Sequence, residues 1–379
     1  MLGLDRIYCM DCLEGLKQLN DNSIDCVVTS PPYWGLRDYG IEGQLGLEKT
    51  PEEYVSKLVS IFKEVHRVLK WRGTVWLNLG DSYCGSGIHA EHHANPGKSQ
   101  SAKRGCTHSN EVPSGLKPKD LVGIPWRVAF ALQNDGWWLR QDIIWSKPNP
   151  MPESVTDRCT KSHEYVFLLT KSKDYYYDAE AIRESSNTSG GACFGKQNFD
   201  SNGTLAQSRK LKSDKEGASV KYWSGANKRS VWTITTKPFS GAHFATFPPD
   251  LIEPMIKAGT SEKGVCPECG KPWIRITEQE KINTRPGLNT GNKKSGTDFD
   301  PKSKYRQQIV SKTLGWQSSC KCNKEPSPAI VLDPFMGSGT TGLVARKLLR
   351  HYIGFELNPE YVKMAQDRLS CIPQRLELF

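Results

Sequence analysis

The stretch Ala329-Ile-Val-Leu-Asp-Pro-Phe-Met-Gly-Ser-Gly-Thr-Thr341 decides the fold of this chain. It opens with an apolar run of strand length, and a helical pattern follows from Thr341 to Leu349. A further apolar run over 352–356 predicts a second strand. Strand, helix and strand in this order are typical of a parallel sheet with helices packed on it.

The same alternation recurs toward the N-terminus. Apolar runs predict strands over 24–29 and 73–79 with a helix between them, and Thr50-Pro51 supplies its N-cap and first turn. Runs over 137–145 and 165–170 predict an antiparallel pair. We therefore expect an α/β fold with a doubly wound, mostly parallel sheet. Three polar segments interrupt this pattern, and we interpret the first two as long loops: 82–118, 184–230 and 279–318.

Composition limits the classes of protein that need to be considered. Among 379 residues the formal net charge is +10, which favours a polyanionic partner. The sequence shows no apolar run near the ~18 residues of a membrane span and no secretory signal at its start. We expect an intracellular, cytoplasmic protein without membrane contact. Twelve cysteines in such a chain argue against a disulfide framework.

The turn after the strand at 329–332 has features of a nucleotide-type ligand site. Gly337 and Gly339 allow close backbone approach, the following helix offers free N–H groups, and Glu356 ends the next strand, where an acid typically binds ribose hydroxyls. A nicotinamide-binding loop is the alternative, because Gly337-x-Gly339-x-x-Gly342 fits its pattern. Asp333 would repel a pyrophosphate but suits a cationic cofactor with a sulfonium and an ammonium group. A plain structural turn is the third interpretation.

Ser30-Pro-Pro-Tyr33 follows the predicted strand at 24–29. Proline cannot continue a central strand, so the motif lies at the carboxyl end of that strand, where open α/β sheets bind ligands. Alone, this tetrapeptide is most simply a strand-ending turn. We expect the loops after two non-adjacent strands to bring Tyr33 and Asp333 to a shared cleft.

Together the two motifs resemble motifs IV and I of the amino-methyltransferases that modify DNA. Their order, Ser-Pro-Pro-Tyr first and Asp-Pro-Phe-Met-Gly-Ser-Gly-Thr last, resembles the β class of that family. Phe244-Ala-Thr-Phe-Pro248 resembles motif X, Asp11 the acid of motif III and Glu356 that of motif II. The resemblance covers roughly 1–80, 120–180, 240–260 and 328–370.

The resemblance implies a Rossmann-like methyltransferase fold, S-adenosylmethionine as cofactor and double-stranded DNA as substrate. It implies the catalytic residues Ser30, Pro31, Pro32 and Tyr33. It implies cofactor contacts from Asp11, Phe244, Thr246, Asp333, Pro334, Phe335, Gly337, Ser338, Gly339, Thr340 and Glu356. A homodimer and a restriction endonuclease partner are further expectations for such a protein.

The chemistry agrees with these assignments. An exocyclic base nitrogen is a poor nucleophile because its lone pair is delocalised into the ring. Acceptors on its N–H bonds, here the Ser30 hydroxyl and the Pro31 carbonyl, favour a tetrahedral nitrogen with a free lone pair. Tyr33 can stack on the base, which must first be flipped out of the duplex.

The identity of the modified base is less constrained. In the family, serine at the first motif position resembles the cytosine-N4 enzymes, and adenine-N6 methylation is the alternative. RNA or protein-glutamine methylation and a non-catalytic DNA-binding module are further hypotheses. Cytosine-C5 methylation is disfavoured, because the chain has no Pro-Cys pair to supply the nucleophile.

Four cysteines form a separate pattern. Cys266-Pro-Glu-Cys269 is a C-x-x-C turn, and Cys320-Lys-Cys322 follows after a long insertion. Two close pairs of thiolates suit a tetrahedral structural zinc ion, which we prefer over a redox C-x-x-C or a disulfide. A second metal site at Cys84, His89, His92, His93, Cys106 and His108 is a weaker hypothesis than a solvated loop.

These motifs suggest a domain plan. We expect a catalytic half over 1–183, with a loop insertion at 82–118, and a cofactor half over 236–260 and 328–379. Basic and aromatic residues between them suggest a DNA target-recognition region over 184–235. Residues 261–327 form the expected zinc-knuckle insertion.

Overall fold

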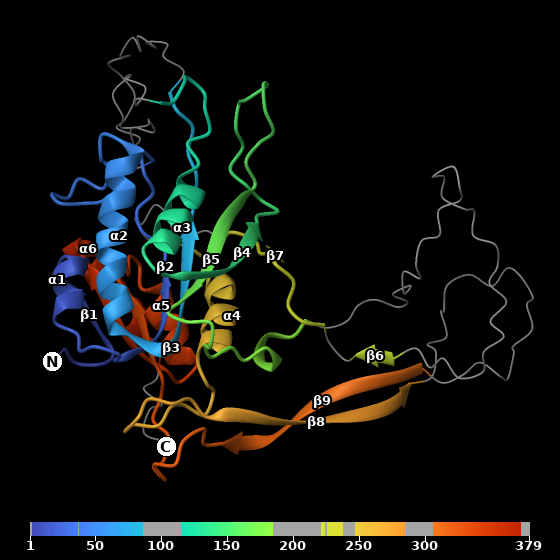
Figure 1. The fold of residues 1–379 in the computed structure, drawn as a ribbon. Helices are drawn as coiled ribbons and strands as arrows, with labels where there is room; N and C mark the ends of the chain where they lie inside the picture. Colours follow the sequence, from blue (N-terminus) through green and yellow to red (C-terminus); the bar gives the residue numbers. More distant parts are fainter. Residues whose placement is uncertain are drawn as a thin grey trace, which may run out of the picture. The chain divides into compact units, whose positions relative to one another are not determined.

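The computed structural model in Figure 1 describes residues 2–36, 38–85, 115–184, 221–223, 226–237, 247–284 and 306–372. The chain divides into two compact units. The first contains Met1–Ala181, Arg229–Ile274 and Trp316–Phe379, and the second Ile182–Lys228 and Arg275–Gly315. Among the described residues, none of the helices is both long and apolar enough to cross a bilayer.

The first unit is built on an eight-stranded sheet with the order β1-β11-β10-β2-β3-β5-β4-β7. Its strands are β1 (Arg6–Cys9), β2 (Ile24–Thr29), β3 (Leu69–Leu79), β4 (Trp138–Ser146), β5 (His163–Thr170), β7 (Val231–Thr233), β10 (Ile330–Asp333) and β11 (His351–Glu356). Neighbours from β1 to β3 are parallel, whereas β5 runs antiparallel to β3 and to β4. The predicted mostly parallel sheet and the predicted antiparallel pair are confirmed.

Helices cover both faces of this sheet, as predicted. They are α1 (Cys12–Lys17), α2 (Pro51–Val68), α3 (Ile124–Asn134), α4 (Pro249–Gly259), α5 (Thr340–Lys347) and α6 (Pro359–Ser370), with a 3₁₀ turn η1 (Glu180–Ile182). Val27 and Val75 face the core with α2 and α3, while Cys26 and Trp76, on the other face, lie against Gly259 of α4. All residues of β2 and residues 73–79 of β3 are buried. Since successive strand residues point to opposite faces, these stretches are covered on both sides.

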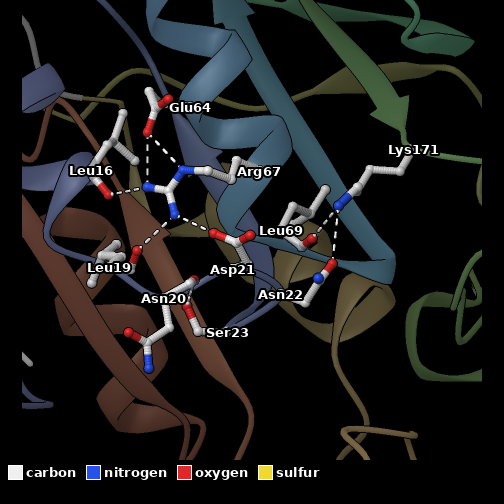
Figure 2. A network of polar contacts seen from close by, with 10 residues as sticks. All are labelled: Leu16, Leu19, Asn20, Asp21, Asn22, Ser23, Glu64, Arg67, Leu69 and Lys171. Carbon is white, nitrogen blue, oxygen red and sulfur yellow. Dashed lines mark hydrogen bonds and ion pairs between the residues drawn. The ribbon is translucent and has the colours of Figure 1, made fainter.

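A polar cluster at the end of α2 fixes the chain where it enters β2 (Figure 2). The Arg67 guanidinium donates to the carbonyl oxygens of Leu16 and Leu19 at 2.8 and 2.9 Å and pairs with Asp21 at 2.6 Å. Glu64 holds the same guanidinium from within the helix at 2.8 Å. These contacts anchor the start of β2, the strand that ends at Thr29 just before Ser30.

The third polar segment contains secondary structure that was not predicted from the sequence. Much of 279–318 forms two long strands, β8 (Ile274–Thr284) and β9 (Arg306–Gln317), where the sequence showed only polarity. With β6 (Lys221–Trp223) they make a three-stranded sheet of order β6-β9-β8. Residues 274–280 are mostly exposed, so this part of β8 lacks the one-sided apolar alternation that reveals a strand in sequence.

Several predictions lie outside the described residues. Phe244 and Thr246 are among them, as are all of the second hypothetical metal site except Cys84 and most of the expected recognition region.

Thr50 caps α2 as predicted, accepting the Glu53 N–H at 3.2 Å, and Pro51 occupies its first turn.

Candidate active site at the carboxyl edge of the sheet

The two motifs meet because their strands are direct neighbours. β2 and β10 pair in parallel with Cys26 opposite Val331 and Val27 opposite Leu332. The expectation of non-adjacent strands is therefore wrong, although the predicted meeting of the loops is correct. The carboxyl ends of parallel strands lie at the same edge, so Thr29 comes to Asp333 and donates a 2.6 Å hydrogen bond to it.

Tyr33 is held in one orientation by its surroundings. Its hydroxyl donates to Glu164 Oε2 at 2.8 Å and accepts from Asn78 Nδ2 at 2.6 Å and Ser30 Oγ at 3.3 Å. A Cβ added at Gly80 would lie 2.5 Å from the tyrosine ring, so only glycine permits this approach. Burial and the charge of Glu164 raise the pKa of Tyr33 well above its ordinary value, so the hydroxyl stays protonated.

Three residues of this network were not predicted from the sequence: Asn78, Lys147 and Glu164. They lie near the ends of β3, β4 and β5, and Glu164 forms an ion pair with Lys147. Burial alone would raise the pKa of Glu164, but the charge of Lys147 and hydrogen bonds from Lys147, Asn78 and Tyr33 hold it below its ordinary value. The sequence held a signal for one of the three: Asn78 is a polar residue within the buried stretch 73–79 of β3.

Two polar atoms near this network have no hydrogen-bond partner among the described residues. Asn78 Oδ1 is buried although its Nδ2 is fully used, and Lys161 Nζ is buried as well. Burial lowers the pKa of Lys161, and the charges of Asp81 and Glu164 act against that shift. Buried polar groups are normally paired, so these atoms indicate that a polar ligand can bind here.

The second motif forms a tight loop between β10 and α5. Gly337 and Gly339 have φ of 51° and 79°, in the left-handed region that favours glycine. The Gly337 N–H donates to Glu356 Oε2 at 2.8 Å, which links the loop to the end of β11. Phe335, Gly337 and Glu356 are partly exposed at this edge, whereas Pro334, Ser338 and Thr340 are buried.

Asp333 is wholly buried beneath the loop. Its carboxylate accepts from the Thr29 and Thr341 hydroxyls at 2.6 and 2.7 Å and from the Phe335 N–H at 3.1 Å. Burial raises its pKa to about 6, although these hydrogen bonds act in the opposite direction. Its observed contacts are thus within the protein, and its predicted cofactor contact stays a prediction.

Two further residues shape the cofactor edge. Arg368 of α6, which was not predicted, donates to the Ser338 carbonyl at 3.0 Å and to Thr340 Oγ1 at 2.9 Å. Asp11 caps α1 by accepting the Leu13 N–H at 2.8 Å. Since Cys9 pairs with Glu356 across β1 and β11, Asp11 lies at the same edge as the glycine loop.

The four predicted cysteine ligands come together. The sulfur atoms of Cys266, Cys269, Cys320 and Cys322 all lie within 4.8 Å of one another. The first pair sits in a turn closed by the Gly270 N–H and the Cys266 carbonyl at 2.9 Å. Paired backbone hydrogen bonds between Val265 and Ser327, 2.8 and 2.9 Å long, join the two chain segments that carry the cluster.

Comparison with known proteins defines the class. Residues 24–266 and 321–367 match the family model N6_N4_Mtase, described as DNA methylase. The chain therefore belongs to this family of DNA methyltransferases, as its motifs implied.

Individual relatives agree with this assignment. The chain is 40% identical over 362 residues to the Type II methyltransferase M.Cfr9I of Citrobacter freundii, covering 95% of this chain and 86% of that protein. It is 42% identical to M.XycI of Xanthomonas campestris pv. cyanopsidis with the same coverage. The solved PvuII DNA methyltransferase (cytosine-N4-specific) shares the fold, with a TM-score of 0.53, 18% identity and coverage of 97% and 88%.

Proposed function

We propose that this DNA methyltransferase transfers a methyl group from S-adenosylmethionine to the exocyclic N4 of cytosine in duplex DNA. One observation carries the proposal. Thr29, which precedes the amine-binding motif, is hydrogen-bonded at 2.6 Å to Asp333, which opens the cofactor motif. Two loops joined in this way can hold an amine and a methyl donor close together, and such positioning can supply about 7–11 kcal/mol of the barrier.

The residues at the edge fit S-adenosylmethionine. Phe335 offers a partly exposed ring, Glu356 a partly exposed carboxylate for ribose hydroxyls, and Gly337 a backbone that a ligand can approach. When bound, this cofactor supplies an electrophilic methyl group on a sulfonium sulfur.

The residues of the first motif act on the amine. Ser30 and the Pro31 carbonyl would accept its N–H groups and leave the nitrogen lone pair free for in-line attack on the methyl carbon. As the N–C bond forms, the S–C bond of the sulfonium would break, the neutral thioether would leave, and one N–H proton would be lost to solvent. Tyr33 supports the flipped base with a ring fixed by Gly80 and Glu164. Flipping costs a few kcal/mol, which contacts in the pocket must offset.

Serine at the first motif position supports cytosine-N4 over adenine-N6 methylation, which is the alternative within the family. Methylation of RNA or of a protein glutamine is the further alternative. The protein should be incubated with S-adenosylmethionine and mixed-sequence duplex DNA, and the DNA digested to nucleosides for mass spectrometry. N4-methylcytosine is expected; N6-methyladenine alone would shift the proposal to the alternative. Absence of both, with RNA or protein modified in parallel reactions, would refute it.

The target-recognition region, a restriction endonuclease partner and a homodimer are part of the same proposal. Residues 184–235 are proposed to read the target sequence, and a restriction endonuclease is proposed to share that target. The name Type II methyltransferase carried by the relatives supports such a pairing. Sedimentation of the purified chain with and without DNA tests the proposed homodimer.

We also propose that Cys266, Cys269, Cys320 and Cys322 hold one structural zinc ion. Tetrahedral Zn–S bonds of about 2.3 Å place sulfurs about 3.8 Å apart, which agrees with a cluster whose sulfurs lie within 4.8 Å of one another. Four thiolates leave no open coordination position, as in structural sites. One equivalent of zinc in the purified protein and thiolate-to-cobalt absorption after exchange are expected. Alternatively, sub-stoichiometric metal with all four thiols reactive would refute the site.

A further inference from the structure

A partly buried ion pair lies next to the side chain of Tyr33. Glu164 of β5 lies opposite Trp145 of β4 in the antiparallel pair, and Lys147 follows the end of β4. The side chains of Glu164 and Lys147 are 16% and 18% exposed. Lys147 Nζ also lies 4.3 Å from the centroid of the Trp145 ring. The lysine occupies one carboxylate oxygen, Oε1, and leaves Oε2 for Tyr33 and Asn78.

The direction of every hydrogen bond in the cluster follows from the charge of Glu164. An ionised carboxylate can only accept, so Tyr33 must donate its proton to Oε2, and Asn78 must present its NH2 group, at 2.8 and 3.0 Å. The Tyr33 oxygen then has only lone pairs left. It accepts from Asn78 at 2.6 Å and from the Ser30 hydroxyl at 3.3 Å.

The Ser30 hydroxyl is the last group in this series of hydrogen bonds. Its proton is directed to Tyr33. Asn78 Nδ2 lies 3.3 Å from its oxygen, but the two N–H bonds of this amide are directed to Tyr33 and Glu164, at 2.6 and 3.0 Å. The hydroxyl oxygen therefore keeps a lone pair for a further donor. Under the proposed function, that donor is an N–H of the target amine.

We propose that Glu164, fixed by Lys147, is a positioning residue that sets the hydrogen-bond polarity of Asn78, Tyr33 and Ser30, so that Ser30 meets the target amine as an acceptor. This inference rests on the proposed function and adds a group that acts through other residues. With a neutral, donating side chain at 164, the same network could reverse, and Ser30 would direct its proton toward the amine instead of a lone pair.

Glu164→Gln tests the proposal, because it keeps the shape and removes the acceptor-only character. Loss of one oriented polar group commonly lowers kcat by about 10²–10³-fold, and a loss near the lower value is expected. The affinity for S-adenosylmethionine should stay within about twofold, since the loop after β10 is untouched. In a cycle with Tyr33→Phe, the two losses in kcat should be strongly non-additive, because Glu164 acts through the Tyr33 hydroxyl.

Asp25→Asn is the matched control. Asp25 is also a buried carboxylate paired with a lysine, Lys70 at 2.7 Å, but it lies near the amino end of β2, away from Ser30. This variant should lose stability and keep its kcat per cofactor-binding site. Wild-type protein that methylates no DNA would refute the proposed function itself. Active wild type with Glu164→Gln within threefold of its kcat, or additive losses with Tyr33→Phe, would overturn the polarity role.

Discussion

Thr29 Oγ1 donates to Asp333 Oδ1 at 2.6 Å, and this contact joins two motifs that are 304 residues apart in the chain. Both residues are wholly buried or nearly so, and Thr341 binds the other carboxylate oxygen at 2.7 Å. The loops of the proposed amine and cofactor sites thus share one buried carboxylate, so disturbing it should affect both.

Thr29→Val should destabilise the protein and weaken the binding of S-adenosylmethionine. The substitution replaces the hydroxyl with a methyl group of similar volume. The buried carboxylate oxygen of Asp333 then lacks this donor, and such a loss costs about 1–3 kcal/mol of stability. Urea denaturation and cofactor calorimetry would measure the two effects. Thr170→Val is the matched control, because its hydroxyl donates at 2.8 Å to a neutral carbonyl, that of Ser172. Equal losses in both variants, with cofactor affinity unchanged, would contradict the special role of the Thr29 contact.

Asp333 should make the free energy of unfolding fall as the pH rises. Its folded pKa is raised to about 6 by burial, above its value in the unfolded chain. A group of this kind contributes stability fully below its unfolded pKa, about 3.9, and loses that contribution as the pH rises through its folded pKa. Asp333→Asn should therefore flatten the dependence of the unfolding free energy on pH between about 4 and 7. A steeper decline in the variant than in the wild type would show the opposite sign.

Gly80→Ala should lower kcat with little change in cofactor affinity. The new methyl group would sit 2.5 Å from the ring of Tyr33, so the ring must move from its place beside Ser30. Single-turnover methylation, together with cofactor titration, separates the two quantities. Gly85→Ala adds a methyl group with no described residue within 4 Å and serves as the neutral control. Unchanged turnover in the Gly80 variant would mean that the ring position does not matter.

Removing the proposed zinc ion should lower stability without abolishing chemistry at the sheet edge. Cys320→Ser should reduce the metal content and the melting temperature, because a structural site contributes its binding free energy to folding. Cys371→Ser, at an exposed cysteine just after α6, should change neither. Thermal unfolding with and without a chelator provides the measurement. A chelator that leaves the melting temperature of the wild type unchanged would contradict a structural zinc ion.

Much of the fold and the outline of the site could be predicted from local patterns. Apolar periodicity identified β2, β3, β10 and β11, and Thr50-Pro51 marked the start of α2. The long strands β8 and β9 were not predicted, because the exposed side chains over 274–280 show no one-sided apolar alternation. The hydrogen-bond network around the Tyr33 hydroxyl was not predicted for another reason. Asn78 of β3, Glu164 of β5 and Lys147, which directly follows β4, are separated in the sequence and form no motif in the linear chain.

The sequence by itself determined which chemical groups the protein has: an acceptor-rich proline turn, a glycine loop that follows a buried strand, and four paired cysteines. These depend on short-range preferences of the backbone and on the identity of neighbouring residues. The tertiary structure alone decided that β2 lies directly beside β10, that Asp333 is buried under its own loop, and that Glu164 stands behind Tyr33. The physical reason is that strand order and burial follow from how all the elements pack together, and no local pattern records that packing.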